Sequence, residues 1–192
     1  MSSGMDPDAE LLAGFARGDM TAARALTARL SPLVYRLAFR LLQDSGLAED
    51  VTQEAMLRLW RIAPEWRKGE AKVSTWLYGV AFNLCRDKLR QGRRRAAAAL
   101  EDVAEPADPA PSARERLHAR QQGDALQGAL ATLPERQRQA VILRHIEELP
   151  NPEIAEIMQI TVEAVESLTA RGKRGLIKAL EARREELGYE DV

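Results

Sequence analysis

The chain has 192 residues, a formal net charge of −1 and a single cysteine. One cysteine excludes an intramolecular disulfide framework, and with only two histidines beside it no metal site is expected. No apolar run approaches the length of a membrane-spanning helix, and the start MSSGMDPDAELL is acidic rather than a signal peptide, so a cytoplasmic protein is expected.

Apolar residues recur at helical spacing on both sides of a segment with linker composition. Residues 96–113 contain three prolines and four acids but no lysine, arginine or aromatic residue, so they lack the means to bury a core. The sequence therefore predicts an all-α protein with one small helical domain over residues 1–95, a flexible linker over 96–113 and a second domain over 114–192.

The first half is predicted to be a succession of helices. A short helix spans residues 8–16, a second runs from 20 to 30, and Ser31 with Pro32 opens a third that Gly46 closes. A fourth helix is expected over residues 48–63, with its apolar residues repeating at helical spacing.

A long helix follows, with Ser74 or Thr75 as its N-cap. One side is predicted to hold Trp76, Val80, Leu84 and the stem of Lys88, and the opposite side a polar set, Asn83, Arg86, Asp87 and Arg90. Cys85 is expected to be a buried small hydrophobic residue.

An amide and several arginines near exposed aromatic rings are what the capture of unpaired bases needs, because cations hold the backbone and rings stack on bases. The alternative is that the aromatic residues of this region belong to the core: Trp60, Trp66, Trp76 and Tyr78.

Two basic clusters lie on either side of the acidic linker. The first closes the first half with the run RQGRRR at 90–95, and the second includes Lys173, Arg174 and Lys178. Two separate basic faces suit two sites on one nucleic acid, while the acidic tether avoids the phosphates. The alternative for RQGRRR is a solvated helix end favoured by the helix dipole.

Residues 150–180 have the pattern of a helix-turn-helix DNA reader. Asn151 is expected to cap the first helix with Pro152 at its first position, and Thr161 to cap the second. Polar groups early in the second helix and cations later suit base reading followed by phosphate binding. The same corner also serves as plain packing in all-α proteins.

Three segments resemble those of the extracytoplasmic-function sigma factors, the small promoter-specificity subunits of bacterial RNA polymerase. They are AEDVTQEAMLRLWR at 48–61, VSTWLYGVAFNLCRDKLRQGRRR at 73–95 and residues 133–180, in the family's order. The resemblance implies a region 2 bundle followed by a region 4 helix-turn-helix. Family members often have glycine at the turn where this chain has Gln159, so a left-handed non-glycine residue is expected there.

The resemblance also implies roles for single residues. Those expected to bind the β′ subunit of core polymerase are Asp50, Gln53, Glu54 and Arg58. Those expected at the −10 element, beside the loop 66–74, are Thr75, Trp76, Tyr78, Asn83, Arg86, Asp87 and Arg90. Those expected at the −35 element are Glu166, Ser167, Thr169, Ala170, Arg171, Lys173 and Arg174. Glu166 can accept from a cytosine amino group or be a surface acid.

The expected partners are the core polymerase with its β′ and β subunits, promoter DNA and an anti-sigma factor, with the chain a monomer when free of them. No catalysis and no cofactor are expected, because the sequence has no glycine-rich phosphate loop and no nucleophile with a plausible histidine base. A standalone helix-turn-helix regulator and a helical adaptor remain the alternatives, neither of which needs the 48–95 block.

Overall fold

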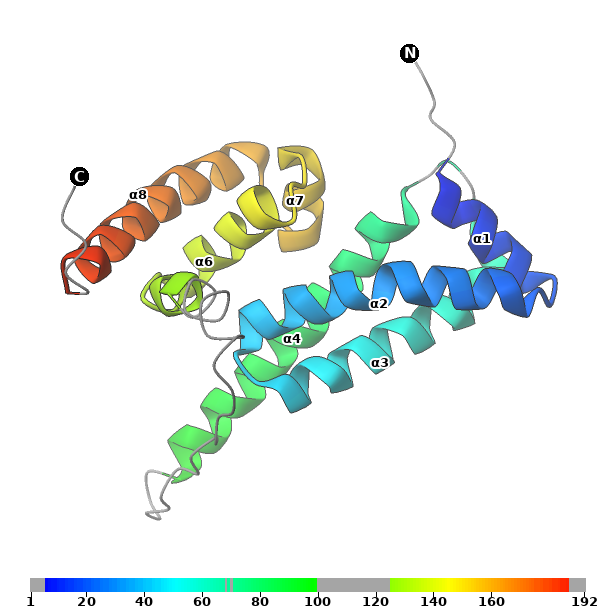
Figure 1. The fold of residues 1–192 in the computed structure, drawn as a ribbon, viewed down its shortest axis with the longest axis horizontal. Helices are drawn as coiled ribbons and strands as arrows, with labels where there is room; N and C mark the ends of the chain where they lie inside the picture. Colours follow the sequence, from blue (N-terminus) through cyan, green and yellow to red (C-terminus); the bar gives the residue numbers. More distant parts are fainter. Residues whose placement is uncertain (1–5, 68, 70, 100–124, 187–192) are drawn as a thin grey trace. The chain divides into compact units, whose positions relative to one another are not determined.

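The chain forms two compact units, Met1–Ala96 and Ala97–Val192, in the computed structural model (Figure 1). The structure describes residues 6–67, 69, 71–99 and 125–186, and throughout this part the regular structure is helical, without strands. The predicted all-α class is therefore confirmed. Most of the predicted linker, residues 100–113 with their four acids, lies outside the described residues.

The first unit contains four α-helices and one short 3-10 turn among its described residues. They are α1 (Pro7–Ala16), α2 (Met20–Leu42), α3 (Ser45–Ile62), η1 (Ala63–Glu65) and α4 (Val73–Ala99). α2 packs on both α1 and α3. Fully buried leucines from all four helices form the core: Leu12, Leu26, Leu30, Leu37, Leu41, Leu59 and Leu77.

The predicted break before Ser31 is wrong, because α2 continues through Pro32. Proline in a helix interior removes one backbone hydrogen bond and costs about 3 kcal/mol. The buried stripe of α2 runs unbroken across that position, with Leu30 and Val34 each about 1% exposed. Packing of this stripe offsets the local cost, and Pro32 itself lies on the exposed side.

Gly46 does not close a helix, as the sequence pattern had indicated. α2 ends at Gln43, which adopts the left-handed conformation with φ 58°. Asp44 then caps α3 by accepting a hydrogen bond from the Leu47 amide at 2.8 Å. Gly46 therefore lies in the first turn of α3.

α4 begins at Val73, before the predicted caps Ser74 and Thr75. Its buried face carries Val73, Leu77, Ala81 and Cys85, whereas Val80 and Leu84 are only half-buried. The predicted inner side, with Trp76, Val80 and Leu84, was therefore displaced by one residue around the helix. The prediction that Cys85 is buried is confirmed, since it is 1% exposed.

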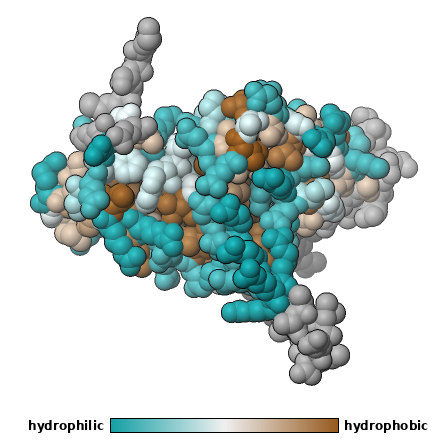
Figure 2. Space-filling model, turned by 180° about the vertical axis from the view of Figure 1, so that it is seen from behind, coloured by the Kyte–Doolittle hydropathy of each residue, from teal (hydrophilic) through white to brown (hydrophobic). Residues whose placement is uncertain are grey.

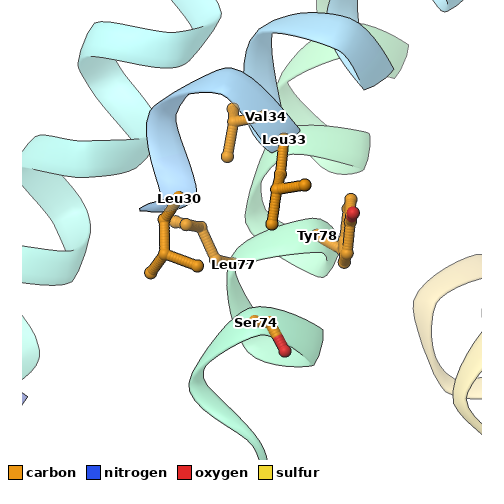
Figure 3. Close-up of a pocket in the computed structure, with 6 residues that line it drawn as sticks. All are labelled: Leu30, Leu33, Val34, Ser74, Leu77 and Tyr78. Atoms are coloured by element: carbon orange, nitrogen blue, oxygen red, sulfur yellow. The ribbon is translucent and has the colours of Figure 1, made fainter. Parts of the chain in front are cut away.

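α2 and α4 pack against one another through an apolar groove (Figure 3). Leu30, Leu33 and Val34 come from α2, and Ser74, Leu77 and Tyr78 come from the first turns of α4. This contact holds the start of α4 against the middle of α2.

The second unit contains helical residues 125–131, α6 (Glu135–Val141), the π-helical turn η3 (Ile142–Ile146), α7 (Asn151–Met158) and α8 (Val162–Glu186). α6 and α7 both pack on α8. Glycines permit the approach of α8, because a Cβ added at Gly172 would lie 2.5 Å from Val141 Cγ2 and one at Gly175 would lie 2.7 Å from Leu133 Cδ2.

α7 and α8 form the predicted helix-turn-helix corner. Gln159 ends α7 in the left-handed conformation, with φ 54° and ψ 52°, so the expected strained non-glycine residue is confirmed. Thr161 caps α8 by accepting from the Ala164 amide at 3.2 Å. Asn151 does not cap α7: Pro150 occupies the N-cap position, and the Asn151 side chain donates instead to Glu166 Oε1 at 3.4 Å.

Gly172→Ala is expected to lower the free energy of unfolding of the second unit. The new methyl group meets Val141 Cγ2 and the Gln137 carbonyl oxygen at 3.0 Å, and overpacking of this kind costs about 1–3 kcal/mol. Gly92→Ala is the matched control, because Gly92 is helical and nothing lies within 4 Å of its added Cβ. Denaturant unfolding should show a gain of about 0.5–1 kcal/mol for this control. Equal gains for both variants would contradict the close packing of α6 on α8.

The Cys85 thiol is expected to react slowly in the folded protein. Burial raises its pKa to about 12, and the thiolate is the reactive form. Ellman's reagent at pH 8 should therefore modify Cys85 only at the rate at which the first unit opens. In denaturant the reaction should be immediate. Rapid modification of the native protein would show that this face of α4 is accessible.

Candidate functional site

A polar strip runs along the exposed side of α3. It holds Asp50, Gln53, Glu54 and Arg58, at spacings that place them on one face of the helix. Arg58 Nε donates to Glu54 Oε1 at 2.8 Å, and this hydrogen bond lowers the pKa of Glu54. Lys88 Nζ of α4 lies 3.1 Å from Asp50 Oδ2. Both ion pairs are solvent-exposed, where such pairs contribute little stability, so a partner can replace them at small cost.

Leu57 lies within this strip and was missed by the sequence reading. Its side chain is 49% exposed, although the residues around it are polar. Its exposure could have been predicted from helical spacing. Leu57 falls outside the core stripe of Val51, Ala55 and Leu59 and on the same face as Gln53 and Glu54. On the face drawn in Figure 2, apolar side chains show in separate patches between hydrophilic ones. Leu57 therefore adds one exposed apolar side chain to the polar strip.

The residues expected to capture bases are divided between surface and core. Thr75 and Tyr78 are buried, at 8% and 7% exposed, and pack inward. Arg86 and Arg90 are exposed, and Arg90 pairs with Asp87 at 3.4 Å. Asn83 is half-buried, and its Oδ1 atom is buried without a hydrogen-bond partner. An unpaired buried acceptor is costly, and a bound donor would remove that cost.

A hollow of about 240 Å³ lies between the end of α3 and the start of α4. Its walls are Ile62, Glu65, Trp66, Arg67, Ala71 and Trp76. The rings of Trp66 and Trp76 meet edge to face, with centroids 5.8 Å apart and an interplanar angle of 80°. Trp66 Nε1 is buried and has no hydrogen-bond partner in the described part of the chain. The hollow therefore offers aromatic surfaces and the nearby cation of Arg67.

The sequence allowed two interpretations of the tryptophans, exposed rings that stack on bases or residues of the core, and neither holds for all three. Trp60, Trp66 and Trp76 are all half-buried rather than fully inside or fully exposed. Trp60 packs on Phe15 of α1, with ring centroids 4.6 Å apart, so it belongs to the core. Trp66 and Trp76 instead line the hollow, where their exposed faces remain available to a ligand.

The exposed side of α8 carries most residues expected at duplex DNA. Glu166, Ala170, Arg171, Lys173 and Arg174 are exposed, and Ser167 is half-buried. Thr169 differs, because its hydroxyl oxygen is buried and unpaired. Arg171 donates to the carbonyl and the hydroxyl oxygen of Ser167 one turn earlier. Glu166 is held by the Asn151 amide, so it is an oriented acceptor beside the turn.

η3 places a further cation, Arg144, on the surface of the second unit. Arg144 and His145 are exposed on this turn, and Arg144 Nη1 donates to the Leu149 carbonyl at 3.1 Å. Partial burial and the positive charges of Lys173 and Arg144 lower the pKa of His145. The basic surface of the second unit therefore extends beyond the helix that the sequence pattern singled out.

Neither a metal site nor a membrane span accompanies these surfaces in the part of the chain described. No group of three or more His, Cys, Asp or Glu side chains is placed there to hold a metal ion. None of the described helices is long and apolar enough to cross a membrane.

Two family patterns match the chain, one in each unit. "Sigma-70 region 2" matches residues 26–95, and "Sigma-70, region 4" matches residues 123–176. The chain is 34% identical over 173 residues to the ECF RNA polymerase sigma factor SigM of Mycobacterium tuberculosis strain H37Rv, covering 90% of this chain and 84% of that protein. It is 30% identical to the RNA polymerase sigma-H factor of Pseudomonas aeruginosa, covering 92% and 95%.

Solved structures share the fold at lower identity. The sigma factor RpoE in its complex with the anti-sigma factor NepR from Bartonella quintana matches with a TM-score of 0.67 and 19% identity, over 82% of this chain and 96% of that one. CnrH, solved with the cytosolic domain of CnrY, also matches with a TM-score of 0.67, at 22% identity, over 91% and 97%.

The polar strip, the aromatic hollow and the helix-turn-helix thus lie in a chain that carries both sigma regions in order. The protein belongs to the extracytoplasmic-function sigma factors, which are not enzymes themselves and direct RNA polymerase to promoters.

Proposed function

We propose that the two units divide promoter recognition between them. Residues 1–95 form region 2, which binds core polymerase and the −10 element; residues 96–113 are the linker; and residues 114–192 form region 4, which binds the −35 element. The observation that carries this proposal is that the first unit presents two different surfaces. The polar strip with Leu57 suits a protein partner, and the aromatic hollow followed by arginines suits single-stranded DNA.

Core polymerase binds the exposed side of α3. Asp50, Gln53 and Glu54 supply the polar contacts to the β′ subunit, with Arg58 behind them, and Leu57 adds an apolar contact at their centre. The β subunit completes the core enzyme as partner. Replacing the exposed pairs Asp50–Lys88 and Glu54–Arg58 by contacts to the polymerase costs little, because both are solvated in the free chain.

The −10 element is captured as a single strand by the hollow and the following turns of α4. A base leaves the stack and enters the hollow, where it packs on the exposed surfaces of Trp66 and Trp76. Asn83 offers an amide to a second base, and Arg86 and Arg90 bind phosphates, with Asp87 orienting Arg90. Thr75 and Tyr78 act from the core by holding the start of α4 in place.

The −35 element is read as duplex by α8. Glu166 and Ser167 lie near the N-terminal end of the helix, where helix-turn-helix readers reach base edges. Ala170, Arg171, Lys173 and Arg174 follow along the exposed side and hold the backbone phosphates. Thr169 lies at the edge of this set, with its hydroxyl turned inward.

A dedicated anti-sigma factor holds the chain inactive until the inducing signal arrives. The support is that the structural neighbours RpoE and CnrH were solved with NepR and with the cytosolic domain of CnrY. In the absence of partners the chain is a monomer in the cytoplasm, where the chromosome and core polymerase are found. No cofactor is required.

Run-off transcription with core RNA polymerase tests the division of labour between α3 and α4. Asn83→Ala should weaken capture of single-stranded −10 DNA by about tenfold, as expected for one lost polar base contact, while core binding stays unchanged. The pair Gln53→Ala with Glu54→Ala should do the reverse. Binding to core enzyme, binding of the holoenzyme to a −10 oligonucleotide and transcript yield are measured on the same preparations.

Two outcomes would contradict this division. Intact open-complex formation by Asn83→Ala would remove its base-capture role. Tight sequence-specific duplex binding without polymerase, together with no binding to core enzyme, would favour a standalone regulator. The matched control is Arg24→Ala, a substitution at an exposed residue of α2 outside both surfaces, which should leave core and oligonucleotide binding unchanged.

Lys173→Ala tests the phosphate contacts of the second unit. Duplex affinity should fall almost uniformly across sequences, and the slope of log K against log salt should decrease by about one. The pKa of His145 should rise in the same variant, because a neighbouring positive charge that disfavours protonation is removed. NMR titration of the imidazole measures this pKa, and an unchanged salt slope would show that Lys173 does not contact phosphate.

A further inference from the structure

Asp6 accepts hydrogen bonds from the first turns of two different helices. Its Oδ1 atom accepts from the Asp8 amide of α1 at 3.1 Å, and its Oδ2 atom accepts from the Val73 amide of α4 at 2.8 Å. The second bond joins residues 67 positions apart in the chain. Asp8, the neighbouring carboxylate, is engaged separately with Arg29 at 3.2 Å.

The Val73 bond supplies a cap that the local sequence of α4 lacks. Lys72 precedes the helix and accepts from the Trp76 amide through its backbone carbonyl at 3.1 Å, but a lysine side chain cannot accept a hydrogen bond. A carboxylate at a helix N-terminus both satisfies an orphan amide and interacts favourably with the helix dipole. One charge at Asp6 serves two helix N-termini in this way.

α1 also braces the other end of the same loop. It packs on η1, and its Phe15 contacts Trp60 at the end of α3. The segment between Trp66 and Val73 is therefore anchored at both ends to α1. This segment carries Trp66, Arg67 and Ala71, which line the hollow, and Trp76 follows on the first turn of α4.

We propose that Asp6 is a positioning residue for −10 capture: by tying the Val73 amide to α1, it fixes the start of α4 and the spacing of the two tryptophan rings. The proposal rests on the proposed function of the hollow. Asp6 does not touch DNA; it acts through the geometry of Trp66 and Trp76. Helix α1 thereby becomes part of the −10 apparatus although it presents no residue to it.

The experiment compares Asp6→Ala and Asp6→Asn with Asp19→Ala in the full-length chain. Asp19 is the matched control, since it caps α2 by accepting from the Thr21 and Ala22 amides at 2.8 and 3.2 Å, within its own segment only. Each holoenzyme is titrated with a single-stranded oligonucleotide carrying the −10 sequence of a promoter it transcribes. Core binding, thermal unfolding and hydrogen exchange of the Val73 amide are measured in parallel.

Asp6→Ala should weaken oligonucleotide binding by about tenfold, the effect of losing one charge-assisted hydrogen bond that orders the site. Exchange of the Val73 amide should accelerate, and core binding should stay unchanged. Asp6→Asn should recover part of the affinity, because its single carbonyl oxygen can still accept from one of the two amides. Asp19→Ala should lose comparable thermal stability but retain oligonucleotide affinity.

Equal losses of oligonucleotide affinity in Asp6→Ala and Asp19→Ala would overturn the proposal, since Asp6 would then act through stability alone. Unchanged affinity in Asp6→Ala with accelerated Val73 exchange would overturn it as well. If Asp6→Ala does not fold, Asp6→Asn decides by the same comparison. Normal oligonucleotide capture by a Trp76→Ala variant would instead mark the failure of the proposed function of the hollow, because Trp76 lines it directly, and this keeps the two failures distinguishable.

Discussion

Aspartate carboxylates at helix N-termini are the interaction on which the first unit depends. Each helix in this unit begins with amide groups that have no hydrogen-bond acceptor within the helix. Asp6 caps α1, Asp19 caps α2 and Asp44 caps α3. Each of these capping residues has an extended backbone, so it ends the preceding connection and directs the next helix. The Asp6 bond to Val73 extends the same device to α4.

The connections between these helices can be short because capping residues and left-handed residues reverse the direction of the backbone within one or two positions. Gln43 ends α2 with positive φ and Asp44 immediately caps α3, so only two residues separate a long helix from its antiparallel neighbour. The buried apolar faces of α2 and α3 then pack on each other. The outer side of α3 and the later turns of α4 are therefore exposed to solvent rather than buried in the core. These exposed surfaces are the ones that suit partners.

In the second unit the main constraint is the close packing of α6 and α7 on the long helix α8. α8 lies against α6 at Gly172 and against Leu133, just before α6, at Gly175, because neither glycine carries a side chain that would hold the chain apart there. Its opposite side is left to carry Glu166, Arg171 and Lys173 outward. The left-handed Gln159 sets the angle between α7 and α8 at a cost of about 1–2 kcal/mol that glycine would avoid. The Asn151 to Glu166 contact across this turn links the two helices beside the proposed reading surface.

Local and periodic features could be predicted from the sequence alone. The two helical units, the burial of Cys85 and the cap at Thr161 follow from residue type and spacing, which act within a few residues of the chain. The left-handed Gln159 was expected from the resemblance to a family that often has glycine at this turn. Membership of the sigma family follows from three motifs in order.

Only the tertiary structure decided features that arise between distant segments. The continuity of α2 through Pro32 depends on the burial of Leu30 and Val34 on either side of it, and the cap of α4 comes from Asp6, 67 residues away. The rotation of α4, which buries Ala81 and leaves Val80 half-exposed, is set by its contact with α2. Local propensity contains no information about such partners, because the free energy that selects them comes from burial and hydrogen bonding across the fold.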